Sequence, residues 1–291
     1  MRFSTAIFLL WVVLAGCSGN ERGESFPIML DRPSAVGDAF RVVSAGTVSS
    51  STEGGGVPSK TEKYVWRLEG VLEVVETDAD GMPRRLSLTV EKLASEAKGG
   101  GELAPAGSQY SLVLNKGVLQ FAFDETFPPD EVQMAVTTLL TVGEPGLDLE
   151  ALFGGAPRRI GEEWAADVDR FVKARRAEGA DVDVSTGAVE GRAVLAGRTE
   201  IDGVECLEIE MSVKMTGDMG ESEWTFTDAA TTIEIEIKVP VDPSLPILEA
   251  AHESEMEMVS PAPTGRGGDL RMTSEKSVTT KVEIIPPAPA G

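Results

Sequence analysis

The feature that most constrains this fold is a two-residue alternation of apolar and polar side chains that appears on both sides of a helical middle. From Leu207 to Met215 every second residue is apolar and the residues between them are polar or charged, and the pattern repeats from Ile233 to Val239. A strand has a period of two, so such a segment buries one face and leaves the other in solvent. The sequence therefore predicts antiparallel sheet with one wet face.

The same alternation occurs in the first part of the chain. Tyr64, Trp66 and Leu68 share one parity, whereas the charged Arg67 has the other. The segment Asp78–Gly81 has the composition of a hairpin turn and leads into a further alternating run. We expect about five strands before residue 125 and about five more after residue 188.

Between these two groups the apolar residues change to helical spacing. A short amphipathic helix is predicted after Pro129 and before Gly143, and a second over residues 165–177, with a less regular turn over residues 147–153. We predict a mainly β (α+β) fold, in which a large curved antiparallel sheet of about ten strands carries this helical insert on its apolar face. Two separate five-strand sheets, with the helices at their boundary, are the alternative that the sequence leaves open.

The N-terminus carries a segment of a different kind. Arg2 precedes an apolar run from Ala6 to Ala15, which is too short to span a bilayer, and the run ends in the residues Leu14-Ala15-Gly16-Cys17. This segment resembles a bacterial lipoprotein signal peptide with its lipobox. The resemblance implies cleavage before Cys17 and attachment of acyl chains, including palmitate, to that residue.

Such acylation would make attachment to a membrane effectively permanent, because each buried methylene contributes about 0.8 kcal/mol. The expected location is therefore the cell envelope, on a membrane facing the periplasm or the exterior. Ser18 follows the acylated residue, and by the rule of well-studied Gram-negative lineages it favours the outer membrane.

These patterns divide the chain into four parts. We expect a signal peptide (1–16), a lipidated N-terminus with a flexible stalk (17–37), a β-rich body (38–285, with a first meander 38–124, a helical middle 125–180 and a second meander 188–285) and a Pro-rich tail (286–291).

Charge and cysteine content narrow the function. The formal net charge is −22 at pH 7. The negative electrostatic field of such a protein repels phosphate backbones, so we expect no nucleic-acid partner. Once Cys17 is acylated, Cys206 is the only thiol left, and no intramolecular disulfide is expected.

Residues with catalytic potential are few. The only histidine, His252, lies on the apolar parity of its strand, which favours a structural role, and Cys206 lies on the polar parity of another strand, so the two are expected to point to different sides. Asp78 and Asp80 resemble part of a calcium loop, but Ser87 stands where the bidentate Glu is required. We expect no catalytic residue, metal site or cofactor, and no enzymatic activity.

Glutamates alternate along three of the later strands, at positions 208 and 210, 234 and 236, and 253, 255 and 257. They would chelate cations if their strands adjoin, whereas the interleaved Lys214 and Lys238 favour a merely solvated face.

Lipobox, stalk, β meander, helical middle and second meander together resemble the half-barrel lipoprotein carriers of the LolA, LolB and LppX type, and a related uncharacterised family of envelope lipoproteins. Two short sequence segments, Arg159–Trp164 and Thr199–Cys206, also resemble segments of these families. The resemblance implies a lipid or another hydrophobic molecule bound in a groove between curved sheet and helices. The alternative is an envelope scaffold or protein-interaction module without a small ligand.

The groove would be lined by apolar residues of the alternating strands, although the same side chains could simply pack beneath the helices. The candidates for hydrophobic ligand binding are Tyr64, Trp66, Leu68, Phe121, Phe123, Ile209, Met211, Trp224, Ile233 and Ile235.

Overall fold

The structure is a computed structural model that describes residues 23–115, 118–122, 128–144, 147–177, 189–216, 228–260 and 269–285. Its strands are β1 (Phe26–Pro27), β2 (Ala39–Gly54), β3 (Lys60–Thr77), β4 (Pro83–Ser95), β5 (Glu102–Ala104), β6 (Gln109–Asn115), β7 (Val118–Phe121), β8 (Pro157–Arg158), β9 (Glu163–Ala165), β10 (Val189–Ile201), β11 (Val204–Thr216), β12 (Asp228–Pro240), β13 (Glu249–Ser260) and β14 (Leu270–Ile284). The helices are α1 (Asp130–Leu140), α2 (Leu149–Phe153) and α3 (Val168–Ala177).

Twelve of these strands form one antiparallel sheet, in the order β7-β6-β4-β3-β2-β14-β13-β12-β11-β10-β9, with β5 paired to β4. The first and last long strands join the two groups, because β14 pairs with β2 from Leu270 opposite Gly54 to Ile284 opposite Phe40. The predicted fold class is therefore confirmed, and the sheet is single, not divided in two. The remaining strands, β1 and β8, form a separate two-stranded ribbon.

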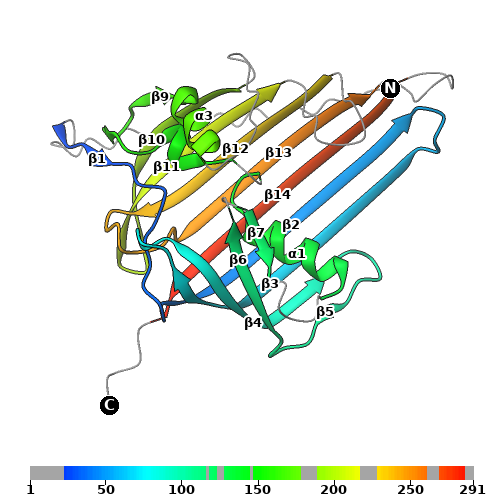
Figure 1. Cartoon of the computed structure of the whole chain (residues 1–291), viewed down its shortest axis with the longest axis horizontal. Coiled ribbons are helices and arrows are strands. Elements are labelled where there is room, and N and C mark those ends of the chain that lie inside the picture. The colour runs from blue at the N-terminus through cyan, green and yellow to red at the C-terminus, as the bar shows by residue number, and fades with distance from the viewer. Residues whose placement is uncertain are drawn as a thin grey trace.

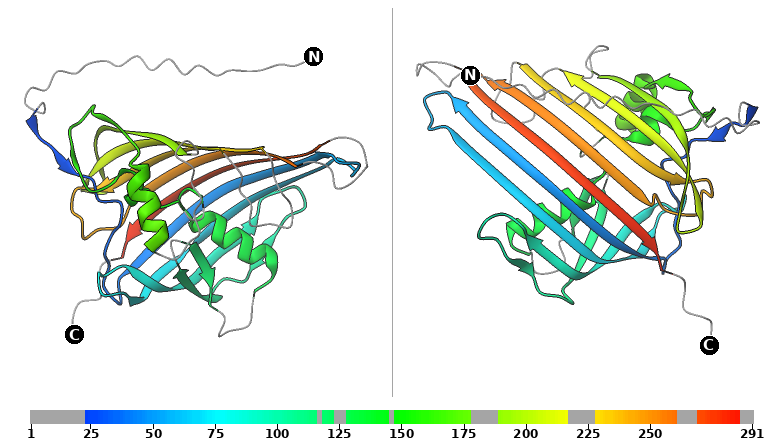
Figure 2. Two further views of the ribbon diagram at one scale, coloured as in Figure 1. Left: turned by 45° about the horizontal axis from the view of Figure 1, so that its top comes forward. Right: turned by 180° about the vertical axis from the view of Figure 1, so that it is seen from behind.

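The sheet curves around its helices, which all lie on one side of it (Figures 1 and 2). We call the side that carries the helices the inner face and the opposite side the outer face. Helix α1 lies near β2 and β3, whereas α3 lies over the other end of the sheet, near β10 and β11 (Figure 1). No helix in the described part of the chain is long and apolar enough to cross a membrane.

Helix α1 forms where the apolar spacing predicts it. Pro129 precedes its first residue, and Asp130 and Glu131 in the first turn suit the positive end of the helix dipole. Its apolar stripe is buried against the sheet and includes Val136 and Leu139, which have no exposed surface. Burial of each such large apolar side chain contributes about 1.5–3 kcal/mol.

The inner face carries two hydrophobic clusters. One lies between α1 and the strands β3 to β7 and includes Trp66, Leu68 and Leu112. The other lies between α2, α3 and the strands β9 to β13 and includes Ile209 and Ile233. Two half-sheets with separate cores thus share one continuous backbone ladder.

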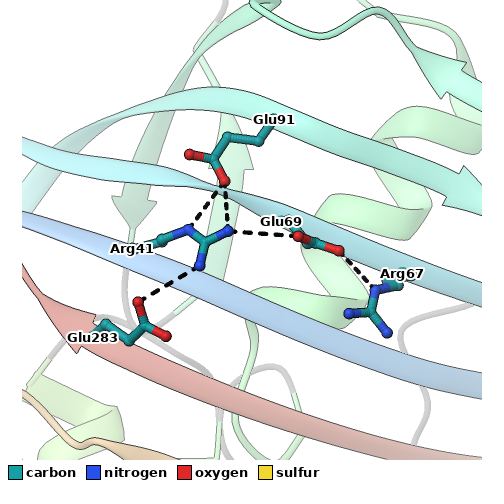
Figure 3. Close-up of polar contacts among 5 residues, drawn as sticks. All are labelled: Arg41, Arg67, Glu69, Glu91 and Glu283. Carbon is teal, nitrogen blue, oxygen red and sulfur yellow. Dashed lines mark hydrogen bonds and ion pairs between the residues drawn. The ribbon is translucent and has the colours of Figure 1, made fainter.

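On the outer face an arginine joins the strands around the β2–β14 junction (Figure 3). Nε and Nη2 of Arg41 on β2 donate to Glu91 on β4 at 3.1 and 3.0 Å, and the guanidinium also forms ion pairs at 3.6 Å with Glu69 on β3 and Glu283 on β14. Glu69 in turn accepts a hydrogen bond from Arg67. The hydrogen bond to Glu91 and its charge, and then Glu283, raise the pKa of Arg41.

Candidate functional site

One hollow on the inner face lies between α1 and the middle strands of the sheet. The strand register aligns Ser274, Met256, Thr231 and Met215 in one row across β14, β13, β12 and β11. This row forms one wall of a cavity of about 460 Å³. Its lining consists of Val48, Val118, Leu119, Thr137, Thr138, Thr141, Glu144, Met215, Thr231, Ser254, Met256, Ser274 and Lys276.

A polar contact closes one side of this cavity. The segment between α1 and α2, which we call the connector, is described at residues 141–144 and 147–148. Oε1 of its Glu144 accepts a 2.6 Å hydrogen bond from the hydroxyl of Ser254 on β13. Lys276 on β14 donates to the Gly143 carbonyl at 2.9 Å and lies 3.3 Å from Glu144. The connector is therefore fixed to the middle of the sheet by two hydrogen bonds and by an ion pair that has no net charge.

The end of α1 is fixed to β14 as well, and to the neighbouring strand β2. The Leu139 carbonyl, which has no partner within the helix, accepts hydrogen bonds from Ser44 on β2 at 2.7 Å and from Thr280 on β14 at 3.1 Å. Ser44 is fully buried. We call Ser44, Ser254, Lys276 and Thr280 the polar seam, because they lie on the inner face between the two hydrophobic clusters.

Three buried polar atoms on the inner face have no hydrogen-bond partner in the structure: Nε1 of Trp66, Oγ1 of Thr231 and Nε2 of His252. Thr231 is only 3% exposed and lines the 460 Å³ cavity. An unpaired buried hydroxyl costs about 1–3 kcal/mol, so native structures supply water or a ligand to such groups.

His252 is buried on the inner face, opposite Ile235 on β12 and Val278 on β14. Burial, and then the positive charge of Lys276, lower the pKa of His252 from its usual 6.5 to about 3. The imidazole is therefore neutral at physiological pH. The structure places this residue in the packed interior, in keeping with the structural role inferred from its parity.

The candidate groove residues pack into the two hydrophobic clusters. Trp66, Leu68 and Phe121 belong to the cluster under α1, where Tyr64 stacks on Trp66 with ring centroids 5.1 Å apart. Those in the other cluster are Ile209, Met211, Ile233 and Ile235. Phe123 and Trp224, like Cys17, lie outside the described residues.

None of the described candidates lines the 460 Å³ cavity, although Phe121 lines a more open hollow of about 430 Å³ beside α1. The actual lining includes Thr231 and Ser254, which interrupt the apolar parity of their strands. A polar residue on an otherwise apolar parity is the signal that could have identified the site in the sequence, and none of our sequence-based predictions used it.

A third hollow, of about 440 Å³, lies where the N-terminal segment meets α2, and Asp31 and Arg175 are among its lining residues. Burial and the nearby carboxylates of Asp148 and Glu150 raise the pKa of Asp31 to about 6, although Arg170 opposes this rise. Glu150 itself accepts hydrogen bonds from the Leu30 amide and from Arg170. This corner is a structural contact between the N-terminal segment and the helices.

The outer face carries the alternating glutamates, and several oppose one another directly. Glu210 pairs with Glu236, Glu234 with Glu253 and Glu255 with Glu275, on strands that do adjoin. Like charges in such positions are mutually destabilising. Within the described ranges, no group of three or more His, Cys, Asp or Glu side chains has the arrangement to hold a metal ion.

Cys206 and His252 do not form a pair. They lie on β11 and β13, with β12 between them, and Cys206 has the parity opposite to that of Met211, which shares the inner-face row of His252. Cys206 is nevertheless fully buried, and this burial raises the pKa of its thiol. The sequence pattern predicted the parity correctly and did not predict the burial.

The Asp78 segment is a hairpin between β3 and β4. The Asp78 carboxylate accepts hydrogen bonds from the backbone amides of Met82 and Asp80 and pairs with Arg84. These contacts, with the Met82 amide first, lower the pKa of Asp78. Its oxygens stabilise a turn, as the predicted hairpin requires.

Comparison with known proteins identifies no family for this chain. No protein-family model matches the sequence, and no curated protein matches it. Among solved structures, this chain is similar to one described as lipid–protein interactions in lipovitellin, with 10% identity, a TM-score of 0.36 and 90% of this chain covered. It spans about a quarter (26%) of that lipovitellin chain.

Two smaller proteins are also similar over most of their length. The LolA superfamily protein NE2245 from Nitrosomonas europaea is 10% identical with a TM-score of 0.15. The match covers 88% of this chain and 91% of that protein. A DUF1329 family protein from Desulfovibrio piger is 13% identical with a TM-score of 0.13, over 84% of this chain and 87% of that one.

Proposed function

We propose that this protein is a non-enzymatic lipoprotein of the cell envelope that binds a hydrophobic molecule between its curved sheet and the helices. The observation that supports this proposal is the cavity of about 460 Å³ between α1 and the strands β11 to β14. Sites for small molecules have volumes of about 300–1,000 Å³, with mostly apolar walls and a few placed polar groups. Val48, Leu119, Met215 and Met256 supply such apolar walls here.

The position of the cavity suits a removable ligand. It lies beside the polar seam, where the two hydrophobic clusters do not meet, so a bound molecule would extend the apolar packing between them. Met215 on β11 and Met256 on β13, on either side of Thr231 on β12, provide flexible apolar surface that adapts to ligand shape.

Anchoring is the second part of the proposal. The run that ends at Cys17 supports lipid attachment at that residue, which would hold the body at a membrane surface, with the outer membrane favoured by Ser18. Cells that express the full chain should incorporate radiolabelled palmitate into it. The variant Cys17→Ser should incorporate none, and an unlabelled wild-type protein would contradict the anchor.

Ligand binding is tested on residues 18–291, because every helix and strand of the structure lies between Phe26 and Ile284. Organic extraction and native mass spectrometry of the purified protein should reveal copurifying lipid. Ser274→Trp would fill the cavity from the inner face of β14 and should abolish this lipid. Ser277→Trp, on the outer face of the same strand, should retain it.

Two results would contradict the proposal. Wild-type protein that is free of lipid and binds none when lipid is added has no ligand site. Equal lipid content in the Ser274→Trp and Ser277→Trp variants would place the ligand elsewhere. A stoichiometric protein partner with no lipid would instead favour an envelope scaffold.

A further inference from the structure

The lining of the cavity is amphipathic, and its polar part consists mostly of hydroxyl groups. Six of the lining residues are Thr or Ser, from α1, the connector and the sheet: Thr137, Thr138, Thr141, Thr231, Ser254 and Ser274. The hydroxyls of Thr137, Thr141 and Ser254 already donate within the protein, to the Gln133 carbonyl, the Thr137 carbonyl and Glu144, and can accept from a ligand hydroxyl. The unpaired Thr231 hydroxyl can also donate to a ligand ester oxygen. These hydroxyl groups offer no net charge to a ligand.

Among the described residues of the lining, the one cation is already neutralised. Lys276 has a side chain that is 12% exposed, lies 3.3 Å from the Glu144 carboxylate and donates to the Gly143 carbonyl at 2.9 Å. Glu144 is held in place by the 2.6 Å hydrogen bond from Ser254. An anionic headgroup in this cavity would bring an additional negative charge beside Glu144 without a free cation to pair with it, which is costly in a partly buried site.

Thr231 provides a separate indication of a polar ligand. Its hydroxyl is buried and without a partner, although the residue lines the cavity. A fully apolar ligand would leave that hydroxyl unpaired, whereas an oxygen at the polar end of an amphiphile could pair with it.

From these three observations we infer that the cavity selects an uncharged amphiphile, with hydroxyl or ester oxygens at its polar end, over an anionic amphiphile of the same chain length. This inference rests on the proposed function and names the class of ligand. The apolar chain would lie along Leu119, Met215 and Met256, and the oxygens would lie near Thr231 and the neighbouring hydroxyls.

The test compares a monoacylglycerol with the lysophosphatidic acid of the same acyl chain, since the two differ only by a phosphate. Displacement of a fluorescent lipid from residues 18–291 gives both affinities, below the concentrations at which the lipids aggregate. The monoacylglycerol should bind at least tenfold more tightly. Thr231→Val should weaken the binding of the monoacylglycerol severalfold, and that of lysophosphatidic acid as well, because both lipids carry a glycerol hydroxyl and an ester.

Glu144→Gln tests the charge argument directly. It removes the carboxylate that neutralises Lys276, so the preference for the uncharged lipid should fall at least tenfold, mainly because lysophosphatidic acid binds more tightly. Glu275→Gln, which removes an equal charge from the outer face, should leave the preference unchanged. If Glu144→Gln fails to fold, the comparison of the two lipids on the wild-type protein still decides the inference.

The outcomes separate the two proposals. Equal or tighter binding of lysophosphatidic acid to the wild-type protein, or a Thr231→Val variant that binds the monoacylglycerol as tightly as the wild-type protein does, would overturn the inference and leave ligand binding intact. Binding of neither lipid, nor of the fluorescent probe, would overturn the proposed function itself.

Discussion

Ser254 donates a 2.6 Å hydrogen bond to Glu144, a residue 110 positions earlier in the chain. Through this contact a strand of the second meander fixes the connector that follows α1 of the helical middle. Lys276 on the adjacent strand completes the arrangement by contacting both Glu144 and the Gly143 carbonyl. The cavity wall is thus assembled from segments that are distant in sequence.

Removal of this contact should loosen the connector. Ser254→Ala leaves Glu144 without its hydroxyl donor, so we expect the free energy of unfolding to fall by about 1–3 kcal/mol in chemical denaturation. Amide hydrogen exchange should accelerate at residues 141–144. Ser277→Ala, on the exposed face of β14, is the control and should change neither quantity. An unchanged exchange rate in Ser254→Ala would show that other contacts hold the connector.

The close approach of α1 to the sheet depends on Gly46 of β2. A Cβ atom at this position would lie 2.9 Å from Val278 Cγ2 and 3.0 Å from Leu139 Cδ2. Gly46→Ala should therefore destabilise the protein by about 1–3 kcal/mol through overpacking.

The combination with Leu139→Ala tests this cause, because truncation of Leu139 removes one of three close contacts, the third being the Ser277 carbonyl oxygen at 3.1 Å. The double variant should be less destabilised than the sum of the two single variants in chemical denaturation. Gly101→Ala, where a Cβ atom has no neighbour within 4 Å, is the matched control and should have little effect. Strict additivity of the two changes would contradict the proposed contact.

Acid should destabilise the protein partly through His252. Because burial and Lys276 lower the pKa of His252 to about 3, the unfolded state binds more protons than the folded state between about pH 6.5 and pH 3. The contribution of neutral His252 to the free energy of unfolding is complete above about pH 6.5 and declines as the pH falls toward about 3. His252→Leu removes this contribution, and the chain has no other histidine.

The measurement is the free energy of unfolding of both proteins across this range. The difference between His252→Leu and the wild-type protein should shift in favour of the variant as the pH falls from about 7 to about 4. Parallel pH profiles would show that His252 is accessible to protons in the folded protein.

The outer face should be stabilised by charge reversal at one position. Glu275 lies directly opposite Glu255, so Glu275→Lys replaces a like-charge pair by an attractive one. We expect a gain of about 0.2–1 kcal/mol, measured by chemical denaturation with urea at low ionic strength. Added salt should reduce the gain by screening.

A second substitution should change the stability in the opposite direction. Glu190 lies opposite Lys214, so Glu190→Lys places two lysines together and should lower the stability. If both substitutions changed the stability in the same direction, cross-strand charge would not be the cause.

The sequence predicted the elements of this fold well, because their signals are local. The alternation from Leu207 to Met215 identified β11, and the helical spacing after Pro129 identified α1. The continuity of the sheet was not predictable in this way, since it depends on the pairing of β2 with β14. The paired residues Phe40 and Ile284 lie near opposite ends of the sequence of the body.

The candidate site was less predictable for the same reason. Apolar parity correctly marked side chains such as Trp66 and Ile233 as inward-facing, but it could not separate residues packed in a core from residues that line a cavity. That distinction depends on where α1 and the connector rest on the sheet, which is set by long-range contacts such as Ser44 with the Leu139 carbonyl.

By itself, the sequence determined which residues form strands and helices and which side of each strand faces inward, because these follow from periods of two and 3.6 residues within short segments. Only the tertiary structure decided that the strands make one sheet, that two hydrophobic clusters remain apart and that hydroxyls with a neutral ion pair line the space beside the polar seam. These features arise from contacts between residues far apart in the sequence, 95 positions for Ser44 with Leu139 and 110 for Glu144 with Ser254. Hydrophobic periodicity within a segment carries no information about them.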